Sequence, residues 1–186
     1  MTATNYSLSF DIDEIVKRLS SEVQEFSDKT ILLTGGRGFI GRYFTEVFVK
    51  LNEGVLDRPV KLIVLDNLIT AGKIGALMAP QNNTEFIEHD VIKPFDCPGS
   101  IDFIIHAAGI ASPFYYRAYP LETLEVAITG TRNMLELAKK KGARFTFFSS
   151  SEIYGDPDPK HVPMAESYRG NVSPHGPRAC YDESKR

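Results

Sequence analysis

The 186-residue sequence lacks the features that mark several classes of protein. Its only two cysteines, Cys97 and Cys180, lie far apart and in no metal-ligand spacing, so a reduced, cytosolic setting is the simplest expectation. The four histidines also lack such spacing, and no metal site is expected. No basic cluster is larger than Lys139–Lys141 and the net charge is −3, which argues against nucleic acid as the main partner.

Long apolar runs are absent as well. No stretch approaches the roughly 20 apolar residues of a membrane span, and the first ten residues lack the basic and apolar parts of a signal peptide. We therefore expect no membrane partner and a cytoplasmic location. The composition is ordinary for a globular domain, with 42% hydrophobic and 24% charged residues, and a chain of this length can bury a sizeable core.

Short apolar runs alternate with helical patterns from residue 30 onward. Continuous apolar strands separated by helices indicate a parallel sheet that is covered on both faces. The predicted fold class is therefore α/β, with a Rossmann-type doubly wound parallel sheet. The expected strands lie within 30–36, 60–66, 84–90, 101–109 and 143–150, and the expected helices within 39–54 and 117–141.

A further helical pattern precedes the first strand. Apolar side chains recur at helical spacing through residues 11–26, which predicts an amphipathic helix packed on the surface of the domain. We therefore divide the chain into an N-terminal helical extension, 1–28, and a nucleotide-binding domain, 29–186. Residues 152–178 are polar and rich in glycine and proline, and loops of this length in compact domains are often functional.

Gly35, Gly38 and Gly41 fall directly between the first strand and the first long helix. Such a turn needs positive φ, a backbone that can approach a pyrophosphate, and a helix that packs close to the strand. The helix N-terminus then offers free N–H groups and the positive end of its dipole to the anion. These glycines predict a phosphate loop for a dinucleotide cofactor.

Carboxylates and small residues end the neighbouring strands. Asp66 ends the second strand, where a carboxylate accepts hydrogen bonds from the ribose of NAD and repels a 2′-phosphate, so NAD is favoured over NADP. Asp90 follows the third strand and either meets the adenine or caps the strand end. The candidate cofactor-binding residues are Gly35, Gly38, Phe39, Ile40, Gly41, Asp66, Asn67, Asp90, Val91, Ala107, Ala108, Gly109, Tyr181 and Lys185.

A candidate catalytic set lies at the end of the fifth strand and in the segment after the long loop. Ser151 and Glu152 follow that strand, where ligands bind in open α/β sheets. Tyr181 and Lys185 are four residues apart, which places a phenol and an ammonium on one face of a helix. An adjacent Lys favours the phenolate, so such a Tyr can act as a base below its reference pKa of about 10.

The motifs TGGRGFIG, LD, HAAG, SSSEIYGDP and YDESK, in this order, resemble the extended short-chain dehydrogenase/reductase family, the NAD-dependent epimerases and dehydratases. The resemblance covers residues 29–186. Within the family, SEIYGDP followed by GPRACYDESKR most resembles the UDP-glucuronate decarboxylase branch, whose members act on nucleotide sugars. The resemblance implies NAD as the cofactor, a nucleotide-sugar substrate and a homodimer.

The resemblance also implies a role for each catalytic candidate. Tyr181 takes the proton of the sugar 4-hydroxyl while C4 is oxidised, and Ser151 hydrogen-bonds the same oxygen. Lys185 lowers the pKa of Tyr181 and binds the nicotinamide ribose. The 4-keto group then accepts electrons so that a C5 carboxylate leaves as carbon dioxide, while Glu152 helps to place the sugar.

Two alternatives remain open on the sequence. Many dehydratases of the family carry Asp where this chain has Ser151, which weakens a dehydratase assignment without excluding it. Family members usually carry Asn where this chain has Ala127, which leaves the substrate open, so a 4,6-dehydratase or 4-epimerase is the first alternative. A non-catalytic NAD-binding module is the second. Family members run well beyond this length, so we expect a truncated chain that binds NAD weakly and turns over no sugar nucleotide.

Overall fold

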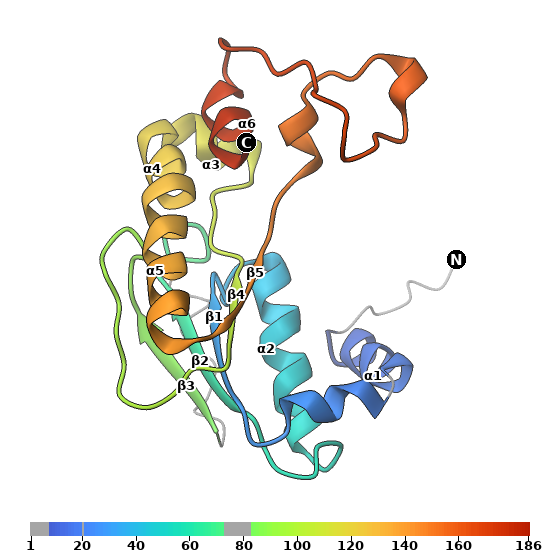
Figure 1. The fold of residues 1–186 in the computed structure, drawn as a ribbon, viewed down its shortest axis with the longest axis vertical. Helices are drawn as coiled ribbons and strands as arrows, with labels where there is room; N and C mark the ends of the chain where they lie inside the picture. The colour runs from blue at the N-terminus through green and yellow to red at the C-terminus, as the bar shows by residue number, and fades with distance from the viewer. Residues whose placement is uncertain (1–7, 20, 73–82) are drawn as a thin grey trace.

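The computed structural model describes residues 8–19, 21–72 and 83–186, and their centre is a parallel sheet (Figure 1). Its five strands lie in the order β3-β2-β1-β4-β5, all of them parallel to their neighbours. This is the strand order of a Rossmann-type sheet, and it confirms the fold predicted from the alternation of apolar runs and helices. The strands are β1 (Thr30–Thr34), β2 (Lys61–Asp66), β3 (Thr84–Glu88), β4 (Phe103–His106) and β5 (Arg144–Phe147).

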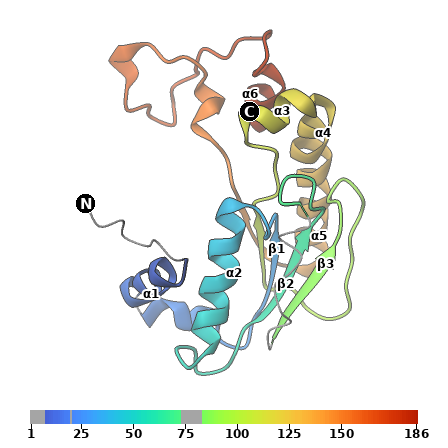
Figure 2. The same ribbon diagram turned by 180° about the vertical axis from the view of Figure 1, so that it is seen from behind.

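Side chains alternate between two hydrophobic clusters, one on each face of the sheet. Leu32 and Ile63 belong to the cluster beneath α5 (Thr131–Lys141), whereas Leu33 and Val64 belong to the cluster beneath α2 (Phe39–Asn52). The helices lie on opposite sides of the sheet in both views (Figures 1 and 2). Because the central strands are buried on both faces, truncating one of these side chains to alanine costs about 2–5 kcal/mol.

The expected helix over 117–141 is a series of shorter helices. They are α3 (Pro113–Ala118), α4 (Pro120–Glu125), a π-helix (Val126–Gly130) and α5. Pro120 causes the first break, because a proline disfavours helical geometry in the residue before it and cannot donate to the preceding turn. None of the helices in the described residues is long and apolar enough to cross a membrane.

The expected helix over 11–26 also differs from the structure. Helix α1 (Leu8–Arg18) begins earlier, and a separate 3-10 helix (Ser21–Phe26) follows it, while residue 20 lies outside the described part. Leu19 is one of the apolar residues in that predicted pattern, and the change of helix leaves its side chain 41% exposed. Helix α1 packs against α2, where the Tyr43 hydroxyl donates to the Asp11 carboxylate at 2.7 Å (Figure 2).

The arrangement of the strands determines where a ligand can bind. The chain leaves β1 toward α2 on one face and leaves β4 toward α3 and α5 on the other face, so the loops diverge between these two neighbouring strands. Ligands bind at such switch points in open α/β sheets. The glycine loop follows β1 and residues 107–109 follow β4, so both predicted motifs lie at this point.

His106 lies in the core just below this edge. Its Nδ1 is 2.7 Å from the Thr34 hydroxyl and its Nε2 is 3.2 Å from the Thr131 hydroxyl, and the side chain is almost fully buried. Burial, with a smaller contribution from the positive charge of Lys185, lowers the pKa of His106 from 6.5 to about 4. The imidazole is therefore neutral at physiological pH and links β1, β4 and α5.

We predict that this histidine makes the protein sensitive to acid. Since its pKa is lower in the folded chain, the unfolded chain binds more protons between pH 6.5 and 4, and the free energy of unfolding falls as the pH falls through this window. The loss is on the order of 3 kcal/mol. Chemical denaturation at a series of pH values should show a shallower decline for His106→Asn than for the unchanged protein. Equal slopes for the two proteins would contradict the assignment.

Candidate active site

A cavity of about 560 Å³ opens at the carboxyl edge of the sheet. It extends from the ends of β2 and β3 across the glycine loop to the segment after β4. Every predicted cofactor-binding residue lines it except Tyr181 and Lys185. The predicted residues in its wall are Gly35, Gly38, Phe39, Ile40, Gly41, Asp66, Asn67, Asp90, Val91, Ala107, Ala108 and Gly109.

The glycine loop is packed so closely that backbone atoms exclude a side chain at Gly35 and at Gly41. Gly35 has φ +71°, and a Cβ there would lie 2.8 Å from the backbone of Ala107 and Ala108. A Cβ on Gly41 would lie 2.0 Å from the Gly35 carbonyl oxygen. Gly38 is less constrained, with φ −68° and a nearest approach of 3.2 Å. The loop therefore brings α2 directly against the end of β1.

The first turn of α2 is suited to an anion. Gly38 is its N-cap residue, no side-chain hydrogen bond from the described residues caps it, and its first turn contains no acidic residue. The first N–H groups of a helix have no partner within the helix, and the helix dipole favours negative charge beside them. A diphosphate would therefore meet unpaired donors and no carboxylate in this turn.

The carboxylates at the strand ends are held in fixed orientations. Asp66 accepts hydrogen bonds from the backbone N–H of Arg37 and of Leu68, both at 2.8 Å, so it joins the glycine loop to the loop after β2. Asp90 accepts from the side chain of Asn67 at 3.2 Å and from the backbone N–H of Ile92 at 3.2 Å. Asp90 is therefore a cap of its own turn, one of the two roles expected for it, and it also lines the cavity.

The structure brings the four catalytic candidates to one edge but does not join them directly. Helix α6 (Ala179–Lys185) packs against the 3-10 helix Ser151–Tyr154. Within the described residues, the Tyr181 hydroxyl has no hydrogen bond to Ser151 or Lys185, and its ring stacks on Tyr116 with centroids 5.5 Å apart. Ser151 is exposed, whereas Tyr181 is 9% exposed.

Lys185 connects this group to the cavity. Its ammonium donates to the Phe148 carbonyl at 3.0 Å and lies 4.9 Å from the centroid of the Phe147 ring. Burial lowers the pKa of Lys185. A Cβ added at Gly109, in the cavity wall, would lie 3.3 Å from the Lys185 Nζ. The lysine therefore reaches from α6 to the end of β4, beside the cavity.

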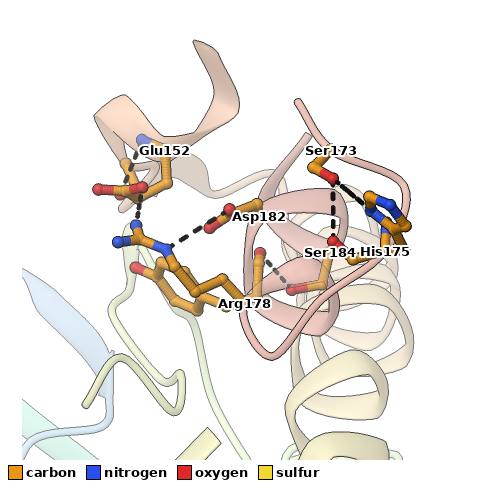
Figure 3. A network of polar contacts seen from close by, with 8 residues as sticks. Glu152, Ser173, His175, Arg178, Asp182 and Ser184 are labelled. Atoms are coloured by element: carbon orange, nitrogen blue, oxygen red, sulfur yellow. Dashed lines mark hydrogen bonds and ion pairs between the residues drawn. The ribbon is translucent and has the colours of Figure 1, made fainter. Parts of the chain in front are cut away.

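Arg178 connects two carboxylates that approach it from different elements (Figure 3). Its guanidinium is hydrogen-bonded to Glu152, and its Nε lies 3.7 Å from Asp182 in the first turn of α6. Asp182 is 8% exposed, and its Oδ1 is buried without a partner among the described residues. Burial raises the pKa of Asp182, and Arg178 opposes that rise. Sequence reasoning assigned no role to Arg178 or Asp182, although both belong to the motif that predicted Tyr181 and Lys185.

Comparison with known proteins agrees with this geometry. The profile described as NAD dependent epimerase/dehydratase family matches residues 31–186. The chain belongs to this family. It is 42% identical over 157 residues to UDP-glucuronic acid decarboxylase 4 of Arabidopsis thaliana, covering 84% of the chain and 33% of that protein. It is 42% identical over 165 residues to UDP-glucuronic acid decarboxylase 1 of Xenopus tropicalis, covering 88% and 37%.

Solved structures carry the same fold. One is the UDP-glucose 4-epimerase of Thermus thermophilus in complex with NAD, which matches with a TM-score of 0.58 and 25% identity over 84% of this chain and 47% of that one. NAD is therefore the cofactor of the family, and the cavity fits it through the glycine cradle, the uncapped helix and Asp66. The chain spans about a third of the length of the two decarboxylases.

We predict that Gly38 and Gly41, at the start of α2, differ in how well they tolerate an added side chain. Gly41→Ala should lower the free energy of unfolding by about 1–3 kcal/mol and abolish cofactor binding, because the methyl group would overlap the Gly35 carbonyl. Gly38→Ala, one turn earlier, is the matched control and should lose less than about 1 kcal/mol. Thermal unfolding and calorimetric titration with NAD measure both effects. Equal losses for the two variants would contradict the close packing.

A second prediction concerns the Arg178 network. In Arg178→Gln, the pKa of Asp182 should rise further, because the cation that opposes the effect of burial is gone. Between pH 3.8 and the raised pKa, the folded chain then binds more protons than the unfolded chain. The free energy of unfolding of the variant should therefore fall as the pH rises through this range. Adding Asp182→Asn should restore part of the loss at neutral pH. If the double variant is no more stable than Arg178→Gln, Asp182 is not the group affected.

Proposed function

We propose that this chain is the NAD-binding part of an enzyme that modifies a nucleotide sugar, with UDP-glucuronate decarboxylation as the reaction. The observation that carries the proposal is the cavity whose wall contains the glycine loop, Asp66 and residues 107–109, with Lys185 reaching its edge. The identity of about 42% to UDP-glucuronic acid decarboxylases supports the choice of substrate. In this proposal residues 29–186 form the nucleotide-binding domain, preceded by a helical extension over 1–28.

In this proposal the cavity residues hold NAD. The glycine loop and the first N–H groups of α2 bind its diphosphate, and Asp66 accepts hydrogen bonds from a ribose. Asn67, Asp90 and Val91 border the adenine end, and residues 107–109 border the nicotinamide end. NAD supplies the oxidant that takes up a hydride from the sugar and returns it at the end of the cycle.

The catalytic candidates act on the sugar. Tyr181 takes the proton from the 4-hydroxyl, and Ser151 hydrogen-bonds the same oxygen. Lys185 stabilises the phenolate by its positive charge, and because burial disfavours that charge, the lysine itself gains from an anionic neighbour. Glu152 orients the sugar, and its hydrogen bond with Arg178 holds it in place. Once C4 carries a keto group, that group accepts the electron pair of the breaking bond, and the C5 carboxylate leaves as carbon dioxide.

The alternative reactions differ in the group they need near the sugar. A 4,6-dehydratase needs an acid that protonates the departing 6-hydroxyl, and position 151 here is a serine rather than an aspartate. A 4-epimerase needs only oxidation and reduction at C4, and solved 4-epimerases share the fold. The decarboxylase is therefore the first choice and the epimerase the second.

Two further parts of the proposal concern the assembly and its location. We propose that the full-length protein forms a homodimer through the helices from α4 to α5 and helix α6. Leu121, Ile128 and Leu135 support this, because they are exposed and recur every seven residues from α4 to α5. A cytoplasmic location is consistent with the two free cysteines, Cys97 and Cys180.

The proposal is tested by separating binding from turnover. The 186-residue chain should bind NAD weakly in a calorimeter and release no carbon dioxide from UDP-glucuronate, whereas the full-length product of the gene should release it. In that longer protein, Tyr181→Phe should lower kcat by about 10²- to 10⁴-fold. Tyr43→Phe, on the face of α2 that packs against α1, should leave kcat unchanged.

The other outcomes discriminate between the alternatives. Carbon dioxide release by the 186-residue chain would contradict the expectation that it is inactive. A longer protein that binds NAD but leaves UDP-glucuronate unchanged would favour an epimerase or dehydratase, to be identified with a panel of sugar nucleotides. Absence of NAD binding by both proteins would overturn the proposal as a whole.

A further inference from the structure

Lys185 is a half-buried cation to which the described residues offer no anion. Its ammonium donates to the Phe148 carbonyl at 3.0 Å, and none of the ion pairs in the described part of the chain includes it. Burial lowers the pKa of this lysine. Withdrawing a charge from water is costly unless other groups stabilise it, so the neighbours of the ammonium decide whether the lysine stays protonated.

The aromatic ring of Phe147 is one of these neighbours. The Lys185 Nζ lies over the ring, 4.9 Å from its centroid, and the negative face of an aromatic ring attracts a cation within about 6 Å. Phe147 ends β5, and the next residue, Phe148, supplies the carbonyl, so two consecutive residues hold the ammonium. An ammonium has three N–H donors, so donors remain for a ligand at the edge of the cavity.

The other side chain that stacks on this ring does not compete with the lysine. The His106 imidazole lies with its centroid 5.9 Å from that of Phe147. Burial, and to a smaller extent the positive charge of Lys185, lowers the pKa of His106 to about 4, so the imidazole is neutral at physiological pH. Phe147 therefore contacts one neutral ring and one cation, and the cation is the neighbour that its ring face stabilises electrostatically.

The contacts of the ammonium determine where it lies relative to the proposed site. A Cβ added at Gly109, in the cavity wall, would lie 3.3 Å from the Lys185 Nζ, and Tyr181 precedes Lys185 by one turn of α6. A lysine side chain is long and flexible, so its end keeps one position only where other groups hold it. The Phe147 ring and the Phe148 carbonyl are those groups.

We propose that Phe147 is a positioning residue that holds the Lys185 ammonium, charged and with free N–H donors, at the edge of the cofactor cavity. This inference rests on the proposed function, in which Lys185 stabilises the phenolate of Tyr181. The ring offsets part of the cost of burial, so the lysine stays protonated before an anion forms beside it. Phe147 contacts neither NAD nor the sugar in this proposal and acts only through Lys185.

The first experiment follows the protonation of Lys185 in the 186-residue chain and needs no cofactor or turnover. NMR of the chain with carbon-13-labelled lysine records the Cε signal of Lys185, assigned with Lys185→Arg, as the pH is raised. Phe147→Leu keeps an apolar side chain but removes the ring. At a pH below the titration midpoint, this variant should contain about 3- to 30-fold more neutral lysine than the unchanged chain.

The matched control is Phe145→Leu, the same change two residues earlier on the same face of β5. Phe145 also lies against His106, with centroids 6.0 Å apart, so both variants lose a contact with the imidazole. The titration of Lys185 should be unchanged in Phe145→Leu. Phe147→Tyr keeps the ring face and should also titrate like the unchanged chain. Identical titrations of Lys185 in Phe147→Leu and in the unchanged chain would overturn the proposal.

A double-mutant cycle separates this role from simple packing. Phe147→Leu should cost less stability in a Lys185→Met background than in the unchanged chain, by about 3- to 30-fold in the unfolding equilibrium constant. The difference should vanish at a pH where the lysine is neutral, whereas Phe145→Leu should cost the same in both backgrounds. Additive effects at every pH would mean that Phe147 only fills space. If Phe147→Leu does not fold, Phe147→Met takes its place in both experiments.

In the full-length product of the gene, the same change should alter the pH dependence of turnover. Oxidation at C4 needs a deprotonated Tyr181 and a protonated Lys185 in the proposed function, so deprotonation of the lysine limits kcat at alkaline pH. Phe147→Leu should move this alkaline limb to lower pH with little change in KM, and Phe145→Leu should not. An unmoved limb in Phe147→Leu would contradict the proposal. If the longer protein turns over no sugar nucleotide, the proposed function fails, and the NMR titration and the cycle still decide this inference.

Discussion

The close contact between the start of α2 and the end of β1 is the constraint on which the site depends. With no Cβ at Gly41, the helix begins against the Gly35 carbonyl, and the turn between them passes beneath residues 107 and 108. As a result, the unpaired N–H groups at the start of the helix face the switch point between β1 and β4. The cavity lies where two loops diverge, and the glycines allow α2 to begin directly against the end of β1.

Polar ties hold the rest of the edge in relation to this contact. Asp66 bonds to two backbone N–H groups and thereby links the loops after β1 and β2. Thr34, His106 and Thr131 form a buried chain of hydrogen bonds across β1, β4 and α5. Lys185 ties α6 to the end of β5. Buried polar groups of this kind are stable only when they are satisfied, so each tie fixes the relative position of two elements.

The sequence predicts most of the sheet and the cofactor side of the site because these features depend on local patterns. Apolar runs locate the five strands, and glycines at this spacing between a strand and a helix are typical of a phosphate loop. The breaks in the helices are harder to foresee. Pro120 is a visible signal for one of them, whereas the π-helix Val126–Gly130 and the change from α1 to the 3-10 helix Ser21–Phe26 have no such marker in the sequence. Local propensity does not contain that information.

The parts of the site that the sequence does not reveal are contacts between segments far apart in the chain. Arg178 meets Glu152 across the long polar loop, and Arg37 stacks on Phe86 of the edge strand β3. Both arginines stand inside motifs whose other residues attract attention first. The two arginines differ in exposure. Arg178 is exposed enough for water to screen its ion pairs. Arg37 is buried, and its Nε and Nη1 have no hydrogen-bond partner within the described residues. Burial lowers the pKa of Arg37, and the carboxylates of Asp66 and Glu46 oppose this effect without forming an ion pair with the guanidinium in the described residues.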